Sequence, residues 1–176
     1  MRALDNWMMV LLSDQNKDRQ RKNSLPLKVR DVMVREVITV DGNSTVKEAV
    51  DTMNEFQIGS LIVLEEGKAK GIVTERDFLR RVIGEAKDVM NIKVKEIMTT
   101  PLVVVAPSAD LEQAVRLMFR KKIKKLAVVD ANKLVGIVTL TDIARVHPPI
   151  VRMLKQLATK ETTPKSMQKV IHYYIV

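Results

Sequence analysis

The sequence has 176 residues, no cysteine and a formal net charge of +9 at pH 7. Without cysteine, disulfides, thiolate catalysis and cysteine-ligated zinc are excluded. Hydrophobic residues make up 46% of the chain but aromatic residues only 3%, which predicts a compact aliphatic core and argues against an aromatic platform for single-stranded nucleic acid.

The N-terminal segment, residues 1–24, is expected to lie outside the main fold. Its opening, MRALDNWMMVLL, is interrupted by Asp5 and Asn6, and no small-residue cleavage site follows, so it predicts a short amphipathic helix and not a signal peptide. A polar linker, residues 13–24, comes next. No apolar run approaches the ~20 residues that a bilayer span needs, so we expect a soluble, cytoplasmic protein.

The rest of the chain contains an internal repeat with an offset of 65 residues. Residues 29–80 align with residues 94–145 without a gap, and 16 of the 52 aligned pairs are identical. VRDVM falls on VKEIM at the start, and GIVTERD falls on GIVTLTD at the end, which indicates a tandem duplication. The predicted parts are an N-terminal helix and linker (1–24), repeat 1 (25–84), repeat 2 (94–147) and a basic C-terminal extension (148–176).

Each repeat is predicted to have the order β-α-β-β-α. A short apolar strand precedes a helix with apolar residues at i, i+3, i+4 and i+7, and a hairpin and a second helix follow. The first helix begins with a capping-box pattern, Thr45 with Glu48 in repeat 1 and Asp110 with Gln113 in repeat 2. The expected strands are 37–40, 61–64 and 69–74, then 102–105, 126–129 and 134–139.

The second helix of each repeat is expected to open at Thr74 or Thr139 and to run to about Ile83 or Val146. One unit of roughly 55 residues buries too little apolar surface to be stable alone. We therefore predict an α+β fold with α/β-type layers, in which the two β-α-β-β-α repeats pack sheet to sheet.

A Thr-x-x-Asp pair closes each repeat at the point where a strand turns into a helix. Thr74 and Thr139 would lie among free backbone N–H groups at the positive end of the helix dipole, which suits a phosphate. Asp77 and Asp142 lie one turn on, and an ionised carboxylate can accept from the two hydroxyls of a ribose. The alternative is that each pair only caps its own helix, since threonine at the N-cap and aspartate at N3 stabilise a helix start.

These blocks, in order in both copies, make residues 25–147 resemble a CBS domain pair, also called a Bateman module, of the small stand-alone kind found in archaea and bacteria. The resemblance implies a regulatory module and not an enzyme. It implies no required cofactor, with AMP, ADP, ATP or S-adenosylmethionine as regulatory ligands in two clefts between the repeats. It also implies a homodimer, and an unidentified protein partner that the module regulates.

The resemblance also suggests residues for the ligand. Ile58 and Gly59 would line an adenine pocket that faces Thr139 and Asp142, with Gly59 letting a ring lie close to the backbone. Their counterparts near the other cleft are Ile123 and Lys124. For both isoleucines, plain core packing is the alternative.

The cationic residues are expected to make the two clefts different from one another. Lys124 and Lys125, in RKKIKK, stand where several family members carry phosphate-reaching His or Arg, whereas Lys121 and Lys122 could equally form a solvated helix end. Arg76 lies inside the first Thr-x-x-Asp, and Thr141 takes its place in the second. The two clefts should therefore differ in charge preference.

Other functions are less well supported by the residues. The sequence pI of about 9.8 and the basic tails raise nucleic-acid association, but no helix-turn-helix, zinc finger or aromatic platform is present. A purely structural dimerisation module is a further alternative, which the intact Thr-x-x-Asp pairs argue against. The two histidines, His147 and His172, fit no metal-ligand pattern, and no nucleophile–base couple is found, so neither a metal site nor catalysis is expected.

Overall fold

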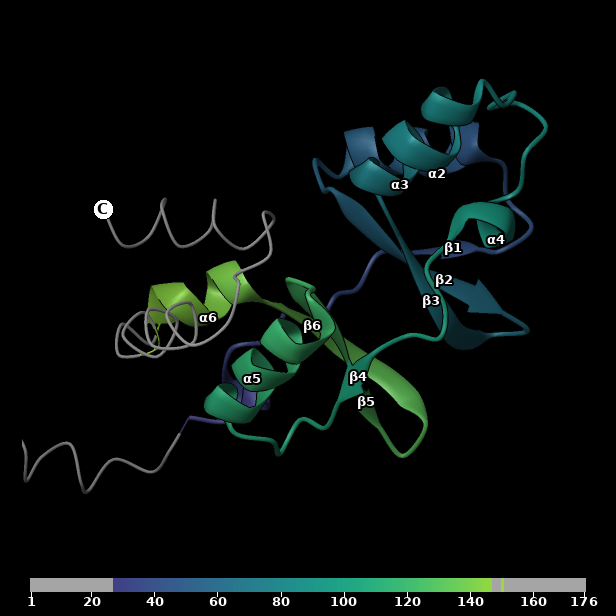
Figure 1. Ribbon diagram of the computed structural model, residues 1–176. Helices are drawn as coiled ribbons and strands as arrows, with labels where there is room; N and C mark the ends of the chain where they lie inside the picture. The colour runs from purple at the N-terminus through teal and green to yellow at the C-terminus, as the bar shows by residue number, and fades with distance from the viewer. Residues whose placement is uncertain (1–26, 147–149, 151–176) are drawn as a thin grey trace, which may run out of the picture.

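The computed structural model describes residues 27–146 and residue 150. The predicted N-terminal helix and linker (1–24), and the C-terminal extension (148–176) apart from Ile150, lie outside the described residues. The described chain forms two lobes, one for each repeat (Figure 1).

The two repeats have the same topology, and the predicted fold class is confirmed. Each holds a three-stranded sheet in which the first strand pairs with the second in parallel and the second pairs with the third as an antiparallel hairpin. The sheets contact one another through their third strands. The elements of repeat 1 are β1 (Thr39–Asp41), α2 (Val46–Glu55), β2 (Ser60–Glu65), β3 (Lys68–Thr74), α3 (Glu75–Arg81) and the 3-10 turn η2 (Ile83–Glu85). Those of repeat 2 are β4 (Val104–Val105), α5 (Leu111–Lys121), β5 (Lys125–Asp130), β6 (Lys133–Thr139) and α6 (Leu140–Val146).

The hairpins preserve the duplication in detail. A β-bulge falls between Val63 and Leu64 in repeat 1 and between Val128 and Val129 in repeat 2, which are equivalent positions. The hairpin turns use residues with positive φ, including Gly67 at 72° and Asn132 at 65°, conformations that glycine and asparagine adopt at low cost.

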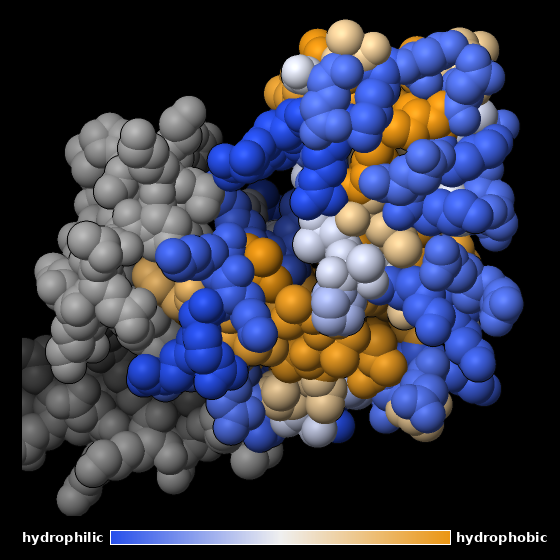
Figure 2. Space-filling model, turned by 45° about the vertical axis from the view of Figure 1, so that its right-hand side comes forward, coloured by the Kyte–Doolittle hydropathy of each residue, from blue (hydrophilic) through white to orange (hydrophobic). Residues whose placement is uncertain are grey.

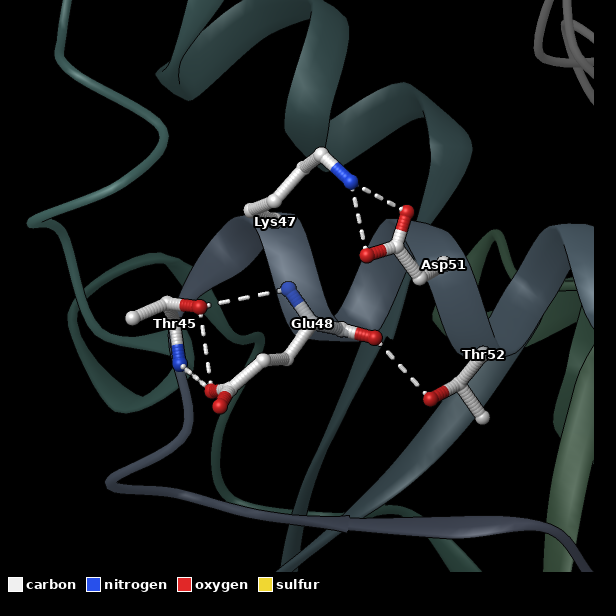
Figure 3. A network of polar contacts seen from close by, with 5 residues as sticks. All are labelled: Thr45, Lys47, Glu48, Asp51 and Thr52. Carbon is white, nitrogen blue, oxygen red and sulfur yellow. Dashed lines mark hydrogen bonds and ion pairs between the residues drawn. The ribbon is translucent and has the colours of Figure 1, made fainter.

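The start of α2 confirms the predicted capping box (Figure 3). Glu48 Oε2 accepts from the backbone N–H of Thr45 at 2.6 Å, and Thr45 Oγ1 accepts from Glu48 N at 3.2 Å. These hydrogen bonds lower the pKa of Glu48, the backbone one most. The capping box of α5 is present as well: Gln113 accepts from Asp110 N at 3.3 Å, and the Asp110 carboxylate also accepts from Lys28 Nζ at 2.8 Å.

The leading segments of the two repeats are exchanged. The 3-10 turn η1 (Val29–Asp31) precedes repeat 1 in the sequence, yet Val29 is buried in the core of repeat 2 and its N–H donates to Ala109 O at 2.9 Å. Helix α4 (Val94–Ile97) precedes repeat 2 in the sequence but lies in the lobe of repeat 1 (Figure 1). Each lobe is therefore completed by a segment that the alignment assigns to the other repeat.

Each lobe has its own hydrophobic core, made mainly of aliphatic side chains. The repeat 1 core is built on the inner faces of α2, β2 and β3, and the repeat 2 core on those of α5, β5 and β6. Ile150, beyond the end of α6, is buried in the repeat 2 core. Over the part of the chain that the structure describes, no helix is both long and apolar enough to cross a membrane.

Candidate functional site

Two clefts lie where the repeats meet, and we call them cleft 1 and cleft 2. Cleft 1 has a volume of about 340 Å³ and cleft 2 about 210 Å³. One face of the molecule is visibly hollowed between the upper and lower lobes, and hydrophilic side chains border much of the hollow (Figure 2). The residues that line cleft 1 are Gly59, Ile72, Thr74, Glu75, Arg76, Asp77, Thr99, Lys122, Ile123, Lys124 and Lys125. Those that line cleft 2 are Val34, Glu36, Val37, Ile38, Ile58, Gly59, Ser60, Lys125, Ile137 and Thr139.

The predicted site residues sort between the clefts in the way that the repeat suggests. Cleft 1 brings together the first Thr-x-x-Asp pair, Arg76 and the 123–125 segment, and cleft 2 brings Ile58 and Gly59 to Thr139. Two residues, Gly59 and Lys125, line both clefts. Asp142 is not among the residues that line either cleft, but its Oδ2 accepts from Oγ1 of Thr139, which lines cleft 2.

In each pair the threonine and the aspartate are hydrogen-bonded to one another. Thr74 N and Oγ1 donate to Asp77 Oδ2 at 2.9 and 2.7 Å. Thr139 N and Oγ1 donate to Asp142 Oδ2 at 3.2 and 2.6 Å, and Thr139 Oγ1 accepts from Asp142 N at 3.2 Å. The threonine hydroxyl proton is thus used inside the helix start, and a phosphate could take it only by replacing this bond.

The helix starts also offer fewer free donors than the sequence suggests. The first N–H of α3, on Glu75, donates to Gly59 O at 3.4 Å, and the equivalent N–H of α6, on Leu140, donates to Lys124 O at 2.9 Å. With the Thr74 and Thr139 N–H groups held by aspartate, the first two N–H groups at each helix start are satisfied by the fold itself. An anion placed here would therefore meet mainly side-chain cations.

Cleft 1 has the positive charge that an anionic ligand would require. Arg76 comes from the first turn of α3, and Lys122, Lys124 and Lys125 come from the end of α5 and the start of β5. Lys122 takes a left-handed conformation, with φ of 56°, where α5 ends. Against these four cations stand the carboxylates of Glu75 and Asp77, so cleft 1 keeps a net positive lining. Cleft 2 has only Glu36 and Lys125 among charged residues of its lining.

Asp77 is the more enclosed acceptor of cleft 1. Its side chain is 14% exposed, and its second oxygen, Oδ1, lies 3.5 Å from Arg81 Nη1. Arg81 Nη1 also donates to the carbonyls of Ile97 at 2.5 Å and Met98 at 2.9 Å. The carboxylate is therefore held in place by both its own helix and the exchanged segment.

Lys125 is a half-buried cation at the boundary of the clefts. Its Nζ donates to Ser60 Oγ at 2.8 Å, and Ser60 is 9% exposed. Burial lowers the pKa of Lys125, while the carboxylates of Glu75 and Asp142 act in the opposite direction and Lys124 adds to the lowering.

Sequence reasoning missed several residues of the linings, among them three with polar or charged side chains: Glu75, Ser60 and Glu36. Glu75 lies against Gly59, where an added Cβ would come 2.9 Å from Glu75 Oε2, so in cleft 1 the space beside this glycine holds a carboxylate. Ser60 could have been found, because it is the repeat equivalent of Lys125 at an offset of 65. Glu36 aligns with Pro101 and carries no signal in the sequence. Among the described residues no group of three or more His, Cys, Asp or Glu side chains is arranged to hold a metal ion.

Comparisons with known proteins agree with this architecture. The CBS domain family model matches residues 29–84 and again residues 94–148. The CBS domain-containing protein YhcV of Bacillus subtilis is 40% identical over 116 residues, which cover 66% of this chain and 82% of YhcV. The inosine-5'-monophosphate dehydrogenase of Methanocaldococcus jannaschii is 36% identical over 120 residues, but the match spans 67% of this chain and only 23% of that enzyme.

A solved structure is similar over both repeats. The CBS domain pair of protein MJ0100, in complex with 5'-methylthioadenosine and S-adenosyl-L-methionine, superposes with a TM-score of 0.64 at 26% identity and covers 72% of this chain and 99% of its own. The double family match, the identity to YhcV and the shared fold lead to one conclusion: the chain belongs to the CBS domain family, as a tandem pair.

Proposed function

We propose that the protein is a regulatory module that binds an adenosine nucleotide, first of all in cleft 1. The observation that supports this most directly is the composition of that cleft, where an enclosed carboxylate at a helix start faces four cationic side chains. Its volume of about 340 Å³ lies within the range of ~300–1,000 Å³ that small-molecule sites occupy. A ligand with hydroxyls at one end and negative charge at the other matches these groups.

The ribose is assigned to Asp77. A carboxylate has about four lone-pair sites, and the two bonds from Thr74 use only Oδ2. Arg81 lies 3.5 Å from Oδ1 and takes one further position, so the 2′- and 3′-hydroxyls can donate to the remaining acceptor positions without breaking the helix cap. Capping and ligand binding are then compatible roles of the same side chain.

The phosphate is assigned to the cations and not to the helix start. Arg76 has a planar guanidinium that can hold two oxygens of one phosphate, and the lysine ammonium groups act as point charges. The cluster of Arg76, Lys122, Lys124 and Lys125 suits AMP, ADP or ATP better than S-adenosylmethionine, whose sulfonium is positive. The adenosyl ligands of the MJ0100 domain pair support the adenosine class as a whole.

Regulation follows from the position of cleft 1 at the boundary of the repeats. A ligand that contacts α3 of repeat 1 and the 122–125 segment of repeat 2 favours whichever relative pose of the lobes lets it reach both. That change in pose would alter contact with a protein partner. Pairing of two modules is part of the proposal, through the helical face of repeat 1, where Leu79 is 61% and Ile83 is 67% exposed.

The test is a ligand screen by thermal shift and isothermal titration calorimetry with AMP, ADP, ATP and S-adenosylmethionine. We expect a phosphorylated adenosine to raise the Tm and to bind, and Asp77→Asn to remove most of that response. Because Asp77 also caps α3, the readout is the ligand-induced shift of each variant and not its absolute Tm. Asp51→Asn is the matched control, since Asp51 pairs with Lys47 on the exposed face of α2, away from the clefts. No response to any of the ligands, or an unchanged response in Asp77→Asn, would refute the assignment.

A further inference from the structure

The two clefts share one cation. Ser60 and Lys125 occupy equivalent positions in the two repeats, 65 residues apart, each at the first residue of the second strand of its sheet. They meet where the repeats meet, with Lys125 Nζ donating to Ser60 Oγ at 2.8 Å. The duplication thus placed a lysine on one side of the boundary and its short polar acceptor on the other.

The side chain of Lys125 lies at the boundary of the two clefts. Its backbone is paired with Thr139, on the wall of cleft 2. Its ammonium group donates to Ser60, which also lines cleft 2, and the strand partner of Ser60, Thr74, lines cleft 1. Lys125 is accordingly part of the lining of both clefts.

The charges around Lys125 are also divided between the clefts. Glu75 acts on it from the side of cleft 1, and Asp142 acts on it from the helix start next to cleft 2. Lys124 opposes it from the same strand start. Cleft 1 keeps Arg76, Lys122 and Lys124 as further cations, but in cleft 2 Lys125 is the sole cation of the described lining, which also holds the carboxylate of Glu36.

We propose that Lys125 couples the two clefts antagonistically, so that a phosphorylated ligand in one cleft lowers the affinity of the other for a second phosphorylated ligand. The inference rests on the proposed function, and it assigns a form of regulation to the same sites. It requires no large movement, only that one ammonium group cannot pair with anions in two places.

The physical basis is local. An ammonium that leaves Ser60 to contact a phosphate in cleft 1 is withdrawn from cleft 2, which then presents Glu36 without a compensating cation to an incoming anion. Filling cleft 2 first has the converse effect on cleft 1, because coupling between binding sites is reciprocal. The remaining cations of cleft 1 make it the first cleft to fill.

Titration calorimetry with AMP on the wild type and a set of single and double variants tests the coupling. Asp142→Asn weakens the ribose acceptor next to cleft 2, so this variant gives the AMP affinity of cleft 1. Asp77→Asn gives the AMP affinity of cleft 2, and the wild type shows binding to both clefts together. If the clefts are coupled, the second binding step of the wild type is weaker, by at least about fivefold, than the affinity of cleft 2 measured in Asp77→Asn. Lys125→Met keeps the aliphatic part of the side chain but removes the charge. Asp142→Asn and Asp77→Asn are also made in the Lys125→Met background. If Lys125 carries the coupling, the isotherm of Lys125→Met should equal the sum of the isotherms of these two double variants.

Lys124→Met is the matched control, because Lys124 lines cleft 1 alone. It should weaken the first step and leave the coupling in place. A wild-type isotherm equal to the sum of the two single-cleft isotherms, or AMP bound in one cleft alone in every protein, overturns the coupling but not the proposed function. Coupling that persists in Lys125→Met overturns the role of this lysine, and no AMP binding in any protein removes the proposed function along with the coupling.

Discussion

The side chain of Met33 lies against the bare face of Gly136. A Cβ added to Gly136 would come 2.7 Å from Met33 Sδ and 3.0 Å from the carbonyl oxygen of Val34. The same contact recurs in the other lobe, where a Cβ on Gly71 would come 2.6 Å from Met98 Sδ and 2.9 Å from Thr99 O. The methionines of VRDVM and VKEIM thus explain the glycines of GIVT, each pair joining an exchanged segment to the strand that it covers.

Gly71→Ala should destabilise the protein. The methionine can move, but the carbonyl of Thr99 belongs to backbone that bridges to Ile72, so the added methyl forces the exchanged segment away from β3. We expect a loss of about 1–3 kcal/mol in the free energy of unfolding, measured by urea denaturation. Lys70→Ala, at an exposed position on the same strand, should change it by less than about 0.5 kcal/mol. Equal effects of the two substitutions would contradict the close contact.

Ile97→Ala should loosen repeat 1, although the sequence alignment places Ile97 in repeat 2. The side chain is fully buried in the repeat 1 core, and truncations of this kind cost about 2–5 kcal/mol. Native-state hydrogen exchange should show faster exchange first in α2 and β2, while α5 and β5 keep more of their protection. Met90→Ala, at a connector position that is 61% exposed, is the control and should leave the exchange pattern unchanged. Loss of protection confined to repeat 2 is the contrary result.

The capping box of α2 should make stability depend on pH in acid. Hydrogen bonds from Thr45 lower the pKa of Glu48 below its ordinary value of 4.5, so the unfolded chain takes up this proton before the folded one does. The stabilisation is therefore fully present above pH 4.5 and is lost as the pH falls through the lowered pKa. Glu48→Gln should flatten this part of the curve of unfolding free energy against pH, and Thr45→Ala, which removes the hydroxyl, should reduce the same slope. An unchanged slope in Glu48→Gln would show that the bonds in Figure 3 do not persist in solution.

Lys125→Met should raise stability while it weakens nucleotide binding. Burial lowers the pKa of Lys125 below 10.5, which means that the charged ammonium is disfavoured in the folded protein. The penalty is full below the lowered pKa and is relieved as the pH rises toward 10.5, because in that window the unfolded chain holds the extra proton. We expect Tm to rise by up to about 2–4 °C at neutral pH, with a smaller gain as the pH approaches 10.5. A fall in Tm would show that the bond to Ser60 outweighs the cost of burial.

Self-association should depend on repeat 1. Leu79 is 61% exposed on α3, whereas its equivalent in repeat 2, Ala144, is 7% exposed. Leu79→Lys places a charge on this face and should shift the protein toward the monomer in light scattering coupled to size-exclusion chromatography. Val104→Lys, at an exposed strand position of repeat 2, is the comparison. A dimer that survives Leu79→Lys but not Val104→Lys would move the interface to the other lobe.

Much of the fold was accessible from the sequence because the duplication repeats its signals. Thr45 with Glu48 marked the start of α2, and the hairpin turns were marked by Gly67 and Asn132. The first strands were predicted as 37–40 and 102–105 but form only at Thr39–Asp41 and Val104–Val105, since parallel pairing with β2 and β5 reaches no further. Helix α3 ends at Arg81 and not near Ile83, which belongs to the separate turn η2.

What the alignment could not give is contact between residues. It showed that Val29 and Val94 are equivalent, but equivalence does not say which lobe each residue enters, and both enter the opposite one. It gave each Thr-x-x-Asp pair correctly as a local unit, yet the satisfied N–H groups of Glu75 and Leu140 depend on carbonyls from the neighbouring strands. Lys125 was assigned to a single phosphate site because the approach of Ser60 is a product of the packing of two lobes.

The exchange of η1 and α4 sets the order in which the chain can be completed. Repeat 1 lacks Val94 and Ile97 until synthesis has passed the connector, so its core closes only after the next repeat has begun to emerge. The core of repeat 2 needs Val29, which is synthesised before either repeat is complete. A chain cut in the connector, between 85 and 93, would yield two pieces, each of which contains the exchanged segment that completes the core of the other. Such halves should be complementary partners that recover structure on mixing, and neither should be an autonomous domain.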